Sequence, residues 1–304
     1  MNPKYNFYML FERQRVLLTL LQALGGKAAP TDFQKLLFLY TRGERVPSYE
    51  FVPYKFGCFS FTSYADKRRL VERGLLTHDE NFLQLTEEGQ KVAREQAVNP
   101  LFVGTFCREH KGLRGTPLVA KVYRLDPYYA TRSEILDKVL TDAAERESVN
   151  KARPAKGKAG ICTIGYEGKC LETYLNQLLR AGVSLLCDVR KNPLSRKYGF
   201  SKSTLKNACD GVGIRYEHLP QLGIASEERR ELNSQADYDA LFENYERKNL
   251  PFQTKPLSQI SEWVKAGECV ALTCFELLPH QCHRHCVAEA VEKQLGGELT
   301  ARHL

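Results

Sequence analysis

Residues 274–286 contain a dense group of side chains that could act in catalysis or ligand binding. Glu276 follows an almost wholly apolar stretch, residues 269–274, which predicts a buried strand. Burial at a strand end can raise the pKa of a carboxylate toward the range of general acid–base catalysis. Cys282 precedes a predicted helix, where a thiol can have a lowered pKa and act as a nucleophile. Glu276 and Cys282 are therefore candidate catalytic residues, although a Glu276 that only forms a salt bridge is an equally good interpretation.

The same run is rich in residue types that bind metals. Cys282 and Cys286 lie one helical turn apart and could share an ion, with help from Cys274 or His218. However, no Cys-x-x-Cys pair elsewhere in the chain completes a structural zinc site, and one contiguous stretch rarely supplies four tetrahedral ligands. We therefore predict no metal and no cofactor, and we keep a zinc ion as the alternative.

Two other predicted strand ends carry polar side chains. Asp188 lies near the end of an apolar stretch over residues 183–190, and Tyr166 ends another over residues 161–166. Together with Glu276 they could form a polar pocket for a sugar or a base, which would suit N-glycosidic chemistry by analogy. We therefore add Asp188 and Tyr166 to the catalytic candidates.

An anionic ligand, such as the phosphate of a nucleotide, is expected at the same place. A helix N-terminus offers free N–H groups and a positive potential, and Arg284 adds a planar guanidinium suited to phosphate or carboxylate. The alternative is that Arg284 pairs with Asp188 or Glu276 and locks the end of the sheet. The predicted ligand-binding residues are Gly165, Arg190, Arg196, Lys197, His283 and Arg284.

Alternating strands and helices in the second half of the chain must position these side chains. Strands are predicted over residues 161–166, 183–190, 214–219, 269–274 and 298–303, and helices over 171–181, 203–210, 238–247, 257–265 and 286–295. This alternation predicts an α/β domain with a parallel sheet and helices on both faces. In such sheets ligands bind outside the carboxyl ends of the strands, where the polar residues gather.

The first half of the chain is predicted to be mainly helical. Helices are expected over residues 15–24 and 60–73, a β-hairpin over 75–86, and a strand over 118–125. Another helix is expected after the capping residues 31–32, and one more begins at residues 86–89. Lys67, Arg68 and Arg69 lie on the helix before the hairpin, where a recognition helix would be found. We predict that these three residues bind DNA, and the alternative is a surface for protein contacts or dimerisation.

Length and composition limit these interpretations. The chain has 304 residues, a length that fits two domains. Its residues are 43% hydrophobic and 26% charged, a composition typical of folded proteins. Ten cysteines are too few for a disulfide scaffold, and no apolar run is long enough to span a membrane. Residues 1–5 lack the apolar stretch of a signal peptide, so we expect a cytoplasmic protein with no membrane partner. The net charge of +8 is compatible with a nucleic-acid partner without requiring one.

The chain divides at a stretch of small, basic, proline and glycine residues. We place a first domain with its extension at residues 1–147, a basic linker at 148–160 and the α/β domain at 161–304. Residues of about 10–97 resemble the winged-helix-like domains of some prokaryotic regulatory and antitoxin proteins. The segments that carry this resemblance are KLLFLY at 35–40 and YKFGCFS at 54–60.

Residues of about 160–304 resemble a second family, the domain-of-unknown-function family 488. Its resemblance rests on four motifs in the same order and spacing, and it implies no particular activity. The motifs are TIGYEG at 163–168, CDVRKNPLSRKYGFSKSTL at 187–205, GIRYEHLPQLG at 213–223 and ALTCFELLPHQCHRHCVAEAV at 271–291.

These observations together favour a prokaryotic DNA-binding protein. Its α/β pocket would bind or process a nucleotide or a modified base, in defence against foreign DNA, and the chain could form a homodimer. If it is an enzyme, an N-glycosidase or another hydrolase acting on nucleic acid or nucleotides is expected. Two alternatives remain: a ligand-sensing transcriptional regulator without catalysis, and a small-molecule enzyme that uses Cys282 or Glu276.

Overall fold

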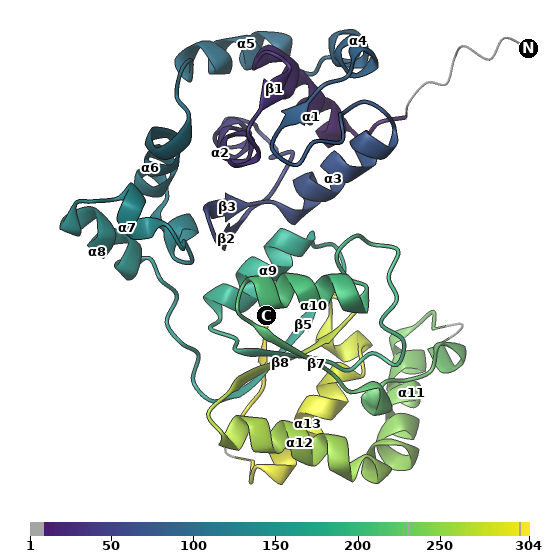
Figure 1. Cartoon of the computed structure of the whole chain (residues 1–304). Coiled ribbons are helices and arrows are strands. Elements are labelled where there is room, and N and C mark those ends of the chain that lie inside the picture. The colour runs from purple at the N-terminus through teal and green to yellow at the C-terminus, as the bar shows by residue number, and fades with distance from the viewer. Residues whose placement is uncertain (1–8, 230–231, 298) are drawn as a thin grey trace, which may run out of the picture. The chain divides into compact units, whose positions relative to one another are not determined.

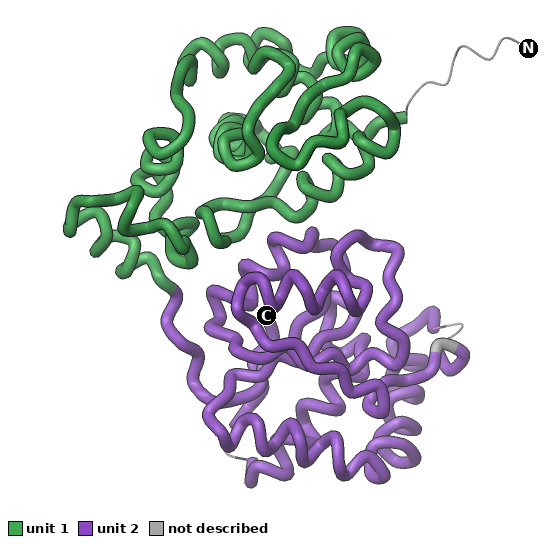
Figure 2. Tube along the Cα trace, viewed as in Figure 1, with its two compact units in different colours: residues 1–153 green, residues 154–304 purple. Residues whose placement is uncertain are grey.

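The computed structural model describes residues 9–229, 232–297 and 299–304 (Figure 1). Residues 1–5, on which the prediction about a signal peptide rests, and residue 298, where the last strand is predicted to begin, lie outside the described residues. The chain divides into two compact units between Arg153 and Pro154 (Figure 2). Within the described part of the chain, no helix has the length and apolar content needed to cross a membrane.

The start of the predicted linker is helical instead of extended. Helix α8 (Ala143–Lys151) continues through residues 148–151 of the linker predicted at 148–160. Val149 is completely buried in the core of the first unit, and its apolar contacts hold this turn of the helix in place. The linker prediction is therefore wrong for these four residues. It relied on the average composition of the stretch, which gives no weight to the single buried side chain of Val149.

Unit 1 (residues 1–153) is mainly helical, as the sequence predicts. Its other helices are α1 (Glu12–Ala23), α2 (Pro30–Thr41), α3 (Phe61–Glu72), α4 (Glu87–Glu95), α5 (Pro100–Glu109), α6 (Gly115–Leu125) and α7 (Leu136–Val139). Its short strands are β1 (Lys27–Ala28), β2 (Val52–Tyr54), β3 (Gly57–Phe59) and β4 (Leu83–Gln84). One apolar core joins these helices.

The hairpin predicted over residues 75–86 is present. Leu76 forms a β-bridge with Leu85, and the Thr77 N–H donates to the Gln84 carbonyl oxygen at 2.9 Å. Strand β4 of this hairpin also pairs with β1 in antiparallel orientation, a contact that the sequence did not predict. The hairpin is therefore tied to the segment between α1 and α2.

The strand predicted over residues 118–125 is wrong, because these residues form most of α6. Leu118, Val119, Val122 and Tyr123 are buried, at the spacing of one face of a helix. A short apolar run fits both the helical and the strand period, and packing of this face into the core of unit 1 decides between them.

Unit 2 (residues 154–304) is an α/β domain, which confirms the predicted fold class. All pairs in its five-stranded sheet are parallel, in the order β7-β6-β8-β5-β9. The strands are β5 (Gly160–Gly165), β6 (Leu185–Asp188), β7 (Arg215–His218), β8 (Cys269–Cys274) and β9 (Arg302–His303). The helices are α9 (Leu171–Arg180), α10 (Lys202–Gly211), α11 (Gln235–Lys248), α12 (Thr254–Lys265) and α13 (Arg284–Gln294).

Helices cover both faces of this sheet, as predicted. Figure 1 shows α9 and α10 on one face and α12 and α13 on the other. Every residue of β6 and β8 is buried, which explains why these strands are continuous apolar runs. Because β6, β8 and β5 are neighbours, their carboxyl ends bring three groups of predicted site residues to one edge of the sheet.

The end of β5 packs closely against the chain that follows β8. A Cβ atom at Gly165 would lie 1.8 Å from the Glu276 carbonyl oxygen, which is backbone and cannot move away cheaply. We therefore expect Gly165→Ala to destabilise unit 2 by about 3 kcal/mol, at the upper end of overpacking costs. Denaturation of the full chain, followed by the fluorescence of the single tryptophan, Trp263 on α12, measures this loss.

Gly160→Ala is the matched control, because Gly160 begins the same strand and a Cβ there meets only one atom, at 3.9 Å. Equal stability of the two variants would contradict the close approach at Gly165.

Candidate functional site

A buried ion pair organises the carboxyl end of β6. Asp188 is completely buried and Arg190 is 6% exposed. Arg190 Nη2 lies 2.5 Å from Asp188 Oδ2, and Nε lies 2.8 Å from Oδ1, so the contact has two points. The backbone N–H of Arg190 also donates to Asp188 Oδ1, at 3.1 Å. A pair so deeply buried needs further hydrogen bonds to offset its lost hydration.

Aromatic residues around the ion pair supply these bonds. The Tyr216 hydroxyl on β7 donates to Asp188 Oδ2 at 2.6 Å, and Arg190 Nη1 donates to the Tyr166 hydroxyl and the Phe200 carbonyl oxygen, both at 2.9 Å. Burial and the nearby Asp188 carboxylate raise the pKa of Tyr216, which keeps its hydroxyl a donor. The rings of Tyr166 and Phe200 stack with centroids 4.3 Å apart.

Asp188, Arg190 and Tyr166 are thus brought together, as the sequence predicts, but they bind one another. Their contacts connect the ends of β5 and β6 to strand β7 and to the loop before α10. Sequence reasoning missed Tyr216 and Phe200, although Tyr216 has the alternating position of an inward-facing strand residue. In this structure the three predicted site residues order the edge of the sheet.

Arg284 orders a different part of the same edge. It is 1% exposed, and its Nη1 and Nη2 donate to the carbonyl oxygens of Glu276 and Leu277 at 2.6 and 2.9 Å. The alternative interpretation expected Arg284 to pair with the side chain of Asp188 or Glu276. It is wrong about the partner, because Arg284 donates to backbone carbonyl oxygens instead. Arg284 Nε is buried and has no hydrogen-bond partner among the described residues.

A second polar group lies where β8 ends and α13 begins. Cys274 is the last residue of β8, and Cys282 and His283 immediately precede α13. One ligand atom from each of the three lies within 4.8 Å of the others, and all three side chains are buried. His283 Nε2 lies 3.0 Å from the Val189 carbonyl oxygen, so this cluster adjoins the Asp188–Arg190 pair.

Glu276 borders the cluster on one side. Its Oε1 pairs with Arg229, from the 3₁₀ turn Ser226–Arg229, and the Cys274 thiol donates to its Oε2 at 3.5 Å. Glu276 and Arg229 are only 13% and 20% exposed. Sequence reasoning missed Arg229, because it lies 47 residues before Glu276 and belongs to no recognisable motif.

The two thiols of the cluster have opposite pKa shifts. A hydrogen bond from Cys282 lowers the pKa of Cys274 against the effect of burial, and His283 and Arg229 lower it further. Burial and the hydrogen bond with Cys274 raise the pKa of Cys282. The lowered pKa expected at Cys282 is therefore found at Cys274, because Cys274 receives the stabilising contacts.

The carboxylate and the imidazole respond to the same surroundings. Burial raises the pKa of Glu276, Cys274 adds to this shift, and Arg229 opposes it. Burial lowers the pKa of His283, but its contacts with Cys274 and Val189 outweigh burial and the net shift is upward. The cluster thus combines two thiols, a carboxyl group, an imidazole and a guanidinium in a nearly dry site.

Other predicted ligand-binding residues lie around these groups without joining them. Lys197 Nζ donates to the Tyr166 carbonyl oxygen at 3.3 Å. Arg196 is exposed and forms no ion pair with any described residue. His218 contacts the Arg190 carbonyl oxygen at 2.9 Å and Lys202 at 3.1 Å instead of the thiols.

Lys67, Arg68 and Arg69 lie on α3 of unit 1, as predicted. The preceding residue, Asp66, is buried and accepts hydrogen bonds from Arg13 at 2.6 Å and Gln14 at 2.7 Å, both on α1. This anchor directs the basic residues outward: Arg68 and Arg69 are exposed and Lys67 is half-buried. None of the three forms an ion pair with a carboxylate among the described residues.

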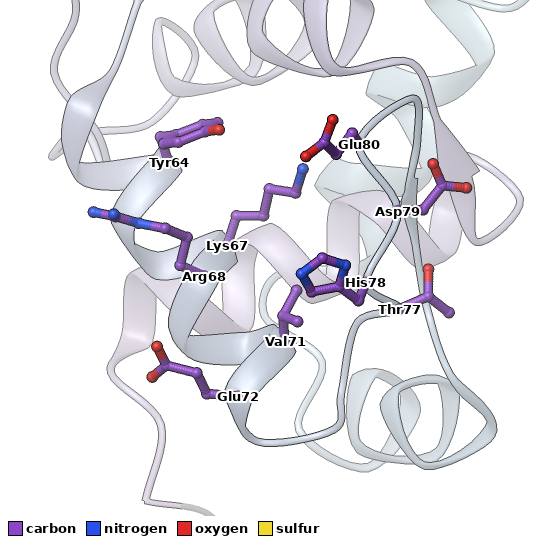
Figure 3. A pocket seen from close by; sticks show the side chains of 9 residues that line it. All are labelled: Tyr64, Lys67, Arg68, Val71, Glu72, Thr77, His78, Asp79 and Glu80. Atoms are coloured by element: carbon purple, nitrogen blue, oxygen red, sulfur yellow. The ribbon is translucent and has the colours of Figure 1, made fainter.

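A groove of about 340 Å³ lies between α3 and the loop of the hairpin. Its charges are mixed: Figure 3 shows Lys67 extending across it toward Glu80. The groove is lined by Tyr64, Lys67, Arg68, Val71, Glu72, Thr77, His78, Asp79 and Glu80.

Comparison with known proteins finds one family model that matches part of unit 2. A family model described as a domain of unknown function, DUF488, matches residues 170–291. This stretch contains three of the four motifs that carry the resemblance noted above, and the first, at 163–168, lies outside it. No curated protein and no solved structure matches the chain. No family model supports the resemblance of residues 10–97 to winged-helix-like domains.

Removing one partner of the buried ion pair leaves the other charge without compensation. We expect Asp188→Asn to lower the free energy of unfolding of unit 2 by about 3–5 kcal/mol, because Arg190 remains charged and buried. The control variant Tyr216→Phe removes only a hydrogen bond to the same carboxylate, and we expect a loss of about 1 kcal/mol. Urea denaturation followed by Trp263 fluorescence measures both losses; equal, small losses would contradict an organising role for the pair.

Proposed function

We propose that the chain is a DNA-binding protein, that α3 of unit 1 supplies the DNA contacts, and that unit 2 binds or processes a nucleotide or a base. The observation that carries this proposal is the run of Lys67, Arg68 and Arg69 on α3. Three adjacent cations without carboxylate partners among the described residues are available to phosphates, the main source of protein–DNA affinity.

The arrangement of unit 1 supports a winged-helix interpretation. Helix α1, strand β1, helices α2 and α3 and then a hairpin follow one another, and β1 pairs with the second strand of the hairpin. In helix-turn-helix proteins the corresponding helix enters the major groove. The β2–β3 hairpin between α2 and α3 is an addition to this arrangement. Most of the positive excess of the chain also lies in residues 1–153.

Charges beside α3 limit which surface can meet DNA. Asp79 and Glu80 stand on the hairpin loop across the groove from Lys67 (Figure 3). Carboxylates repel phosphates, so the tip of this hairpin is a poor phosphate-binding wing. The proposal therefore assigns the main contacts to the helix and only a minor part to the loop.

The cluster of unit 2 supports the second half of the proposal. Glu276 has a raised pKa because it is buried, which brings its proton transfer closer to neutral pH. The Cys274 thiol lies 3.5 Å from its Oε2, and His283 Nδ1 lies 3.9 Å from that thiol. A carboxylate of this kind suits hydrolytic attack on a glycosidic bond or another polar bond of a nucleotide.

The basic run is tested by replacing all three residues. We expect Lys67→Ala, Arg68→Ala and Arg69→Ala together to weaken binding to duplex DNA at least about tenfold at moderate salt and to reduce the slope of log K against log salt by about two to three. Fluorescence anisotropy across a salt series measures both quantities.

A control variant removes the same charge from another part of unit 1. Arg108, Lys111 and Lys121 are exposed residues of α5, α6 and the turn between them, and we expect their joint change to alanine to leave most of the affinity. Equal effects of the two triple variants would mean that binding depends on net charge, and an unchanged salt slope in the α3 variant would remove α3 from the interface.

The acidic loop gives the opposite expectation. Asp79→Asn with Glu80→Gln should strengthen DNA binding a few-fold, because two repulsive charges beside the contact disappear. Asn at position 79 keeps the oxygen that accepts the Asn81 N–H at 2.8 Å, so the loop retains its turn. Glu95→Gln with Glu109→Gln, two exposed residues on α4 and α5, is the matched control. Weaker or unchanged binding of the loop variant would place DNA elsewhere.

Processing is tested with single- and double-stranded DNA, both unmodified and base-modified. We expect the wild-type chain to produce abasic sites or strand breaks, and Glu276→Gln to bind DNA equally well without producing them. Binding without damage would favour a reader or a ligand-sensing regulator. If the chain shows neither DNA binding nor DNA damage, the nucleic-acid proposal is refuted, and an enzyme acting on a small phosphorylated substrate is favoured.

A further inference from the structure

The thiols and the imidazole at the end of β8 have the geometry of a metal site. Zinc binds sulfur at about 2.3 Å and nitrogen at about 2.0–2.1 Å, so tetrahedral ligands lie about 3.6–3.8 Å from one another. His283 Nδ1 lies 3.9 Å from Cys274 Sγ, and Cys282 Sγ lies within 4.8 Å of both. The ligand atoms therefore need to move only slightly to surround an ion.

A backbone contact orients His283 for this role. Its Nε2 lies 3.0 Å from the Val189 carbonyl oxygen, which can only accept a hydrogen bond. The proton of a neutral imidazole therefore belongs on Nε2, and Nδ1 keeps its lone pair toward Cys274. Histidines that bind metals are usually held in this way by a carbonyl or carboxylate on the opposite nitrogen.

Glu276 borders this group of three without belonging to it. Its Oε2 lies 3.5 Å from Cys274 Sγ, so the carboxyl group contacts one of the three side chains from outside. Its Oε1 pairs with Arg229, so its charge already has a partner. The site therefore has three protein ligands, the number found in zinc sites that keep a fourth position open.

We propose that Cys274, Cys282 and His283 bind one zinc ion in unit 2. Two sulfur atoms and one imidazole nitrogen favour zinc over the harder magnesium and calcium ions. Binding requires both thiols to be deprotonated, so two protons leave as the ion enters. The site does not include Cys286, whose Sγ lies 3.4 Å from His285 Nε2, and it does not depend on DNA binding by unit 1.

Unit 2 contains a second thiol pair that serves as the control. Cys162 Sγ and Cys269 Sγ lie 3.9 Å apart on neighbouring strands, and both residues are buried. Arg302 donates to Cys162 Sγ at 3.3 Å, so a cationic guanidinium already contacts this pair and would repel a metal ion. We expect this pair to bind no metal.

The first test is the metal content of the purified full-length chain. Elemental analysis after dialysis is expected to find about one zinc per chain in the wild type and in Cys162→Ala, and less than about a tenth of that in Cys274→Ala and Cys282→Ala. Trp263 lies on α12 of unit 2, so its fluorescence shows whether unit 2 of each variant is folded, independently of zinc. Absence of zinc from a wild-type chain that also takes up none when supplied would overturn the proposal.

Cobalt in place of zinc reports on the ligands directly. The wild-type chain with Co²⁺ should show thiolate-to-metal absorption in the near ultraviolet and the visible bands of a tetrahedral ion. Glu276→Gln should keep the thiolate absorption, because the carboxyl group contacts Cys274 from outside the set of ligands. A wild-type spectrum without thiolate absorption would overturn the proposal.

A third measurement needs no variant and so does not depend on how substitutions fold. Alkylation followed by peptide mass spectrometry should find Cys274 and Cys282 protected by zinc and released by a chelator, with Cys162 and Cys269 indifferent to both. Detection of a Cys274–Cys282 disulfide in place of metal would overturn the proposal and make the pair a redox site. Loss of zinc with retained DNA affinity separates this inference from the function proposed for α3.

Discussion

The ion pair of Asp188 and Arg190 is the constraint on which the functional edge of unit 2 depends. Two opposite charges are held inside the protein, so every polar atom around them must find a partner. Tyr216, Tyr166 and the Phe200 carbonyl meet this requirement, and in doing so they connect the ends of β5 and β6 to β7 and to a loop. The carbonyl oxygen of Val189, the residue between the two charged ones, then contacts His283 Nε2 at 3.0 Å. The position of the thiol cluster follows from the geometry of the charge pair.

Polar residues at this edge therefore divide into two kinds of role. Those at the ends of β5 and β6 and on β7 are saturated by one another and by backbone groups, which suits a rigid frame. Those at the end of β8 and the start of α13 are held partly by weaker contacts of sulfur: Cys274 Sγ lies 3.5 Å from Glu276 Oε2 and 3.9 Å from His283 Nδ1. A rigid frame beside a loosely satisfied group of strong ligands and acids is what a binding or reactive centre requires.

Unit 1 shows the same principle in a different form. Asp66 binds Arg13 and Gln14 inside the core and thereby determines the rotation of α3. The three cations that follow it in sequence therefore turn toward solvent, where nothing among the described residues neutralises them. A buried carboxylate thus sets the orientation of a basic surface, and the acidic hairpin loop beside it limits that surface to the helix.

Local periodicity was enough to predict the elements of unit 2 and a parallel sheet, because alternating apolar strands and amphipathic helices are visible within short windows. It was also enough to place Asp188, Tyr166 and Glu276 at strand ends. It failed at residues 118–125, where the apolar run fits two periods, and at residues 148–151, where one valine holds a helix. The partners of each polar side chain were decided by the tertiary structure alone: Arg229 reaches Glu276 across 47 residues, and Cys274 rather than Cys282 receives the stabilising contacts. Such partnerships depend on strand order and on the paths of loops, which bring together residues that no sequence window contains.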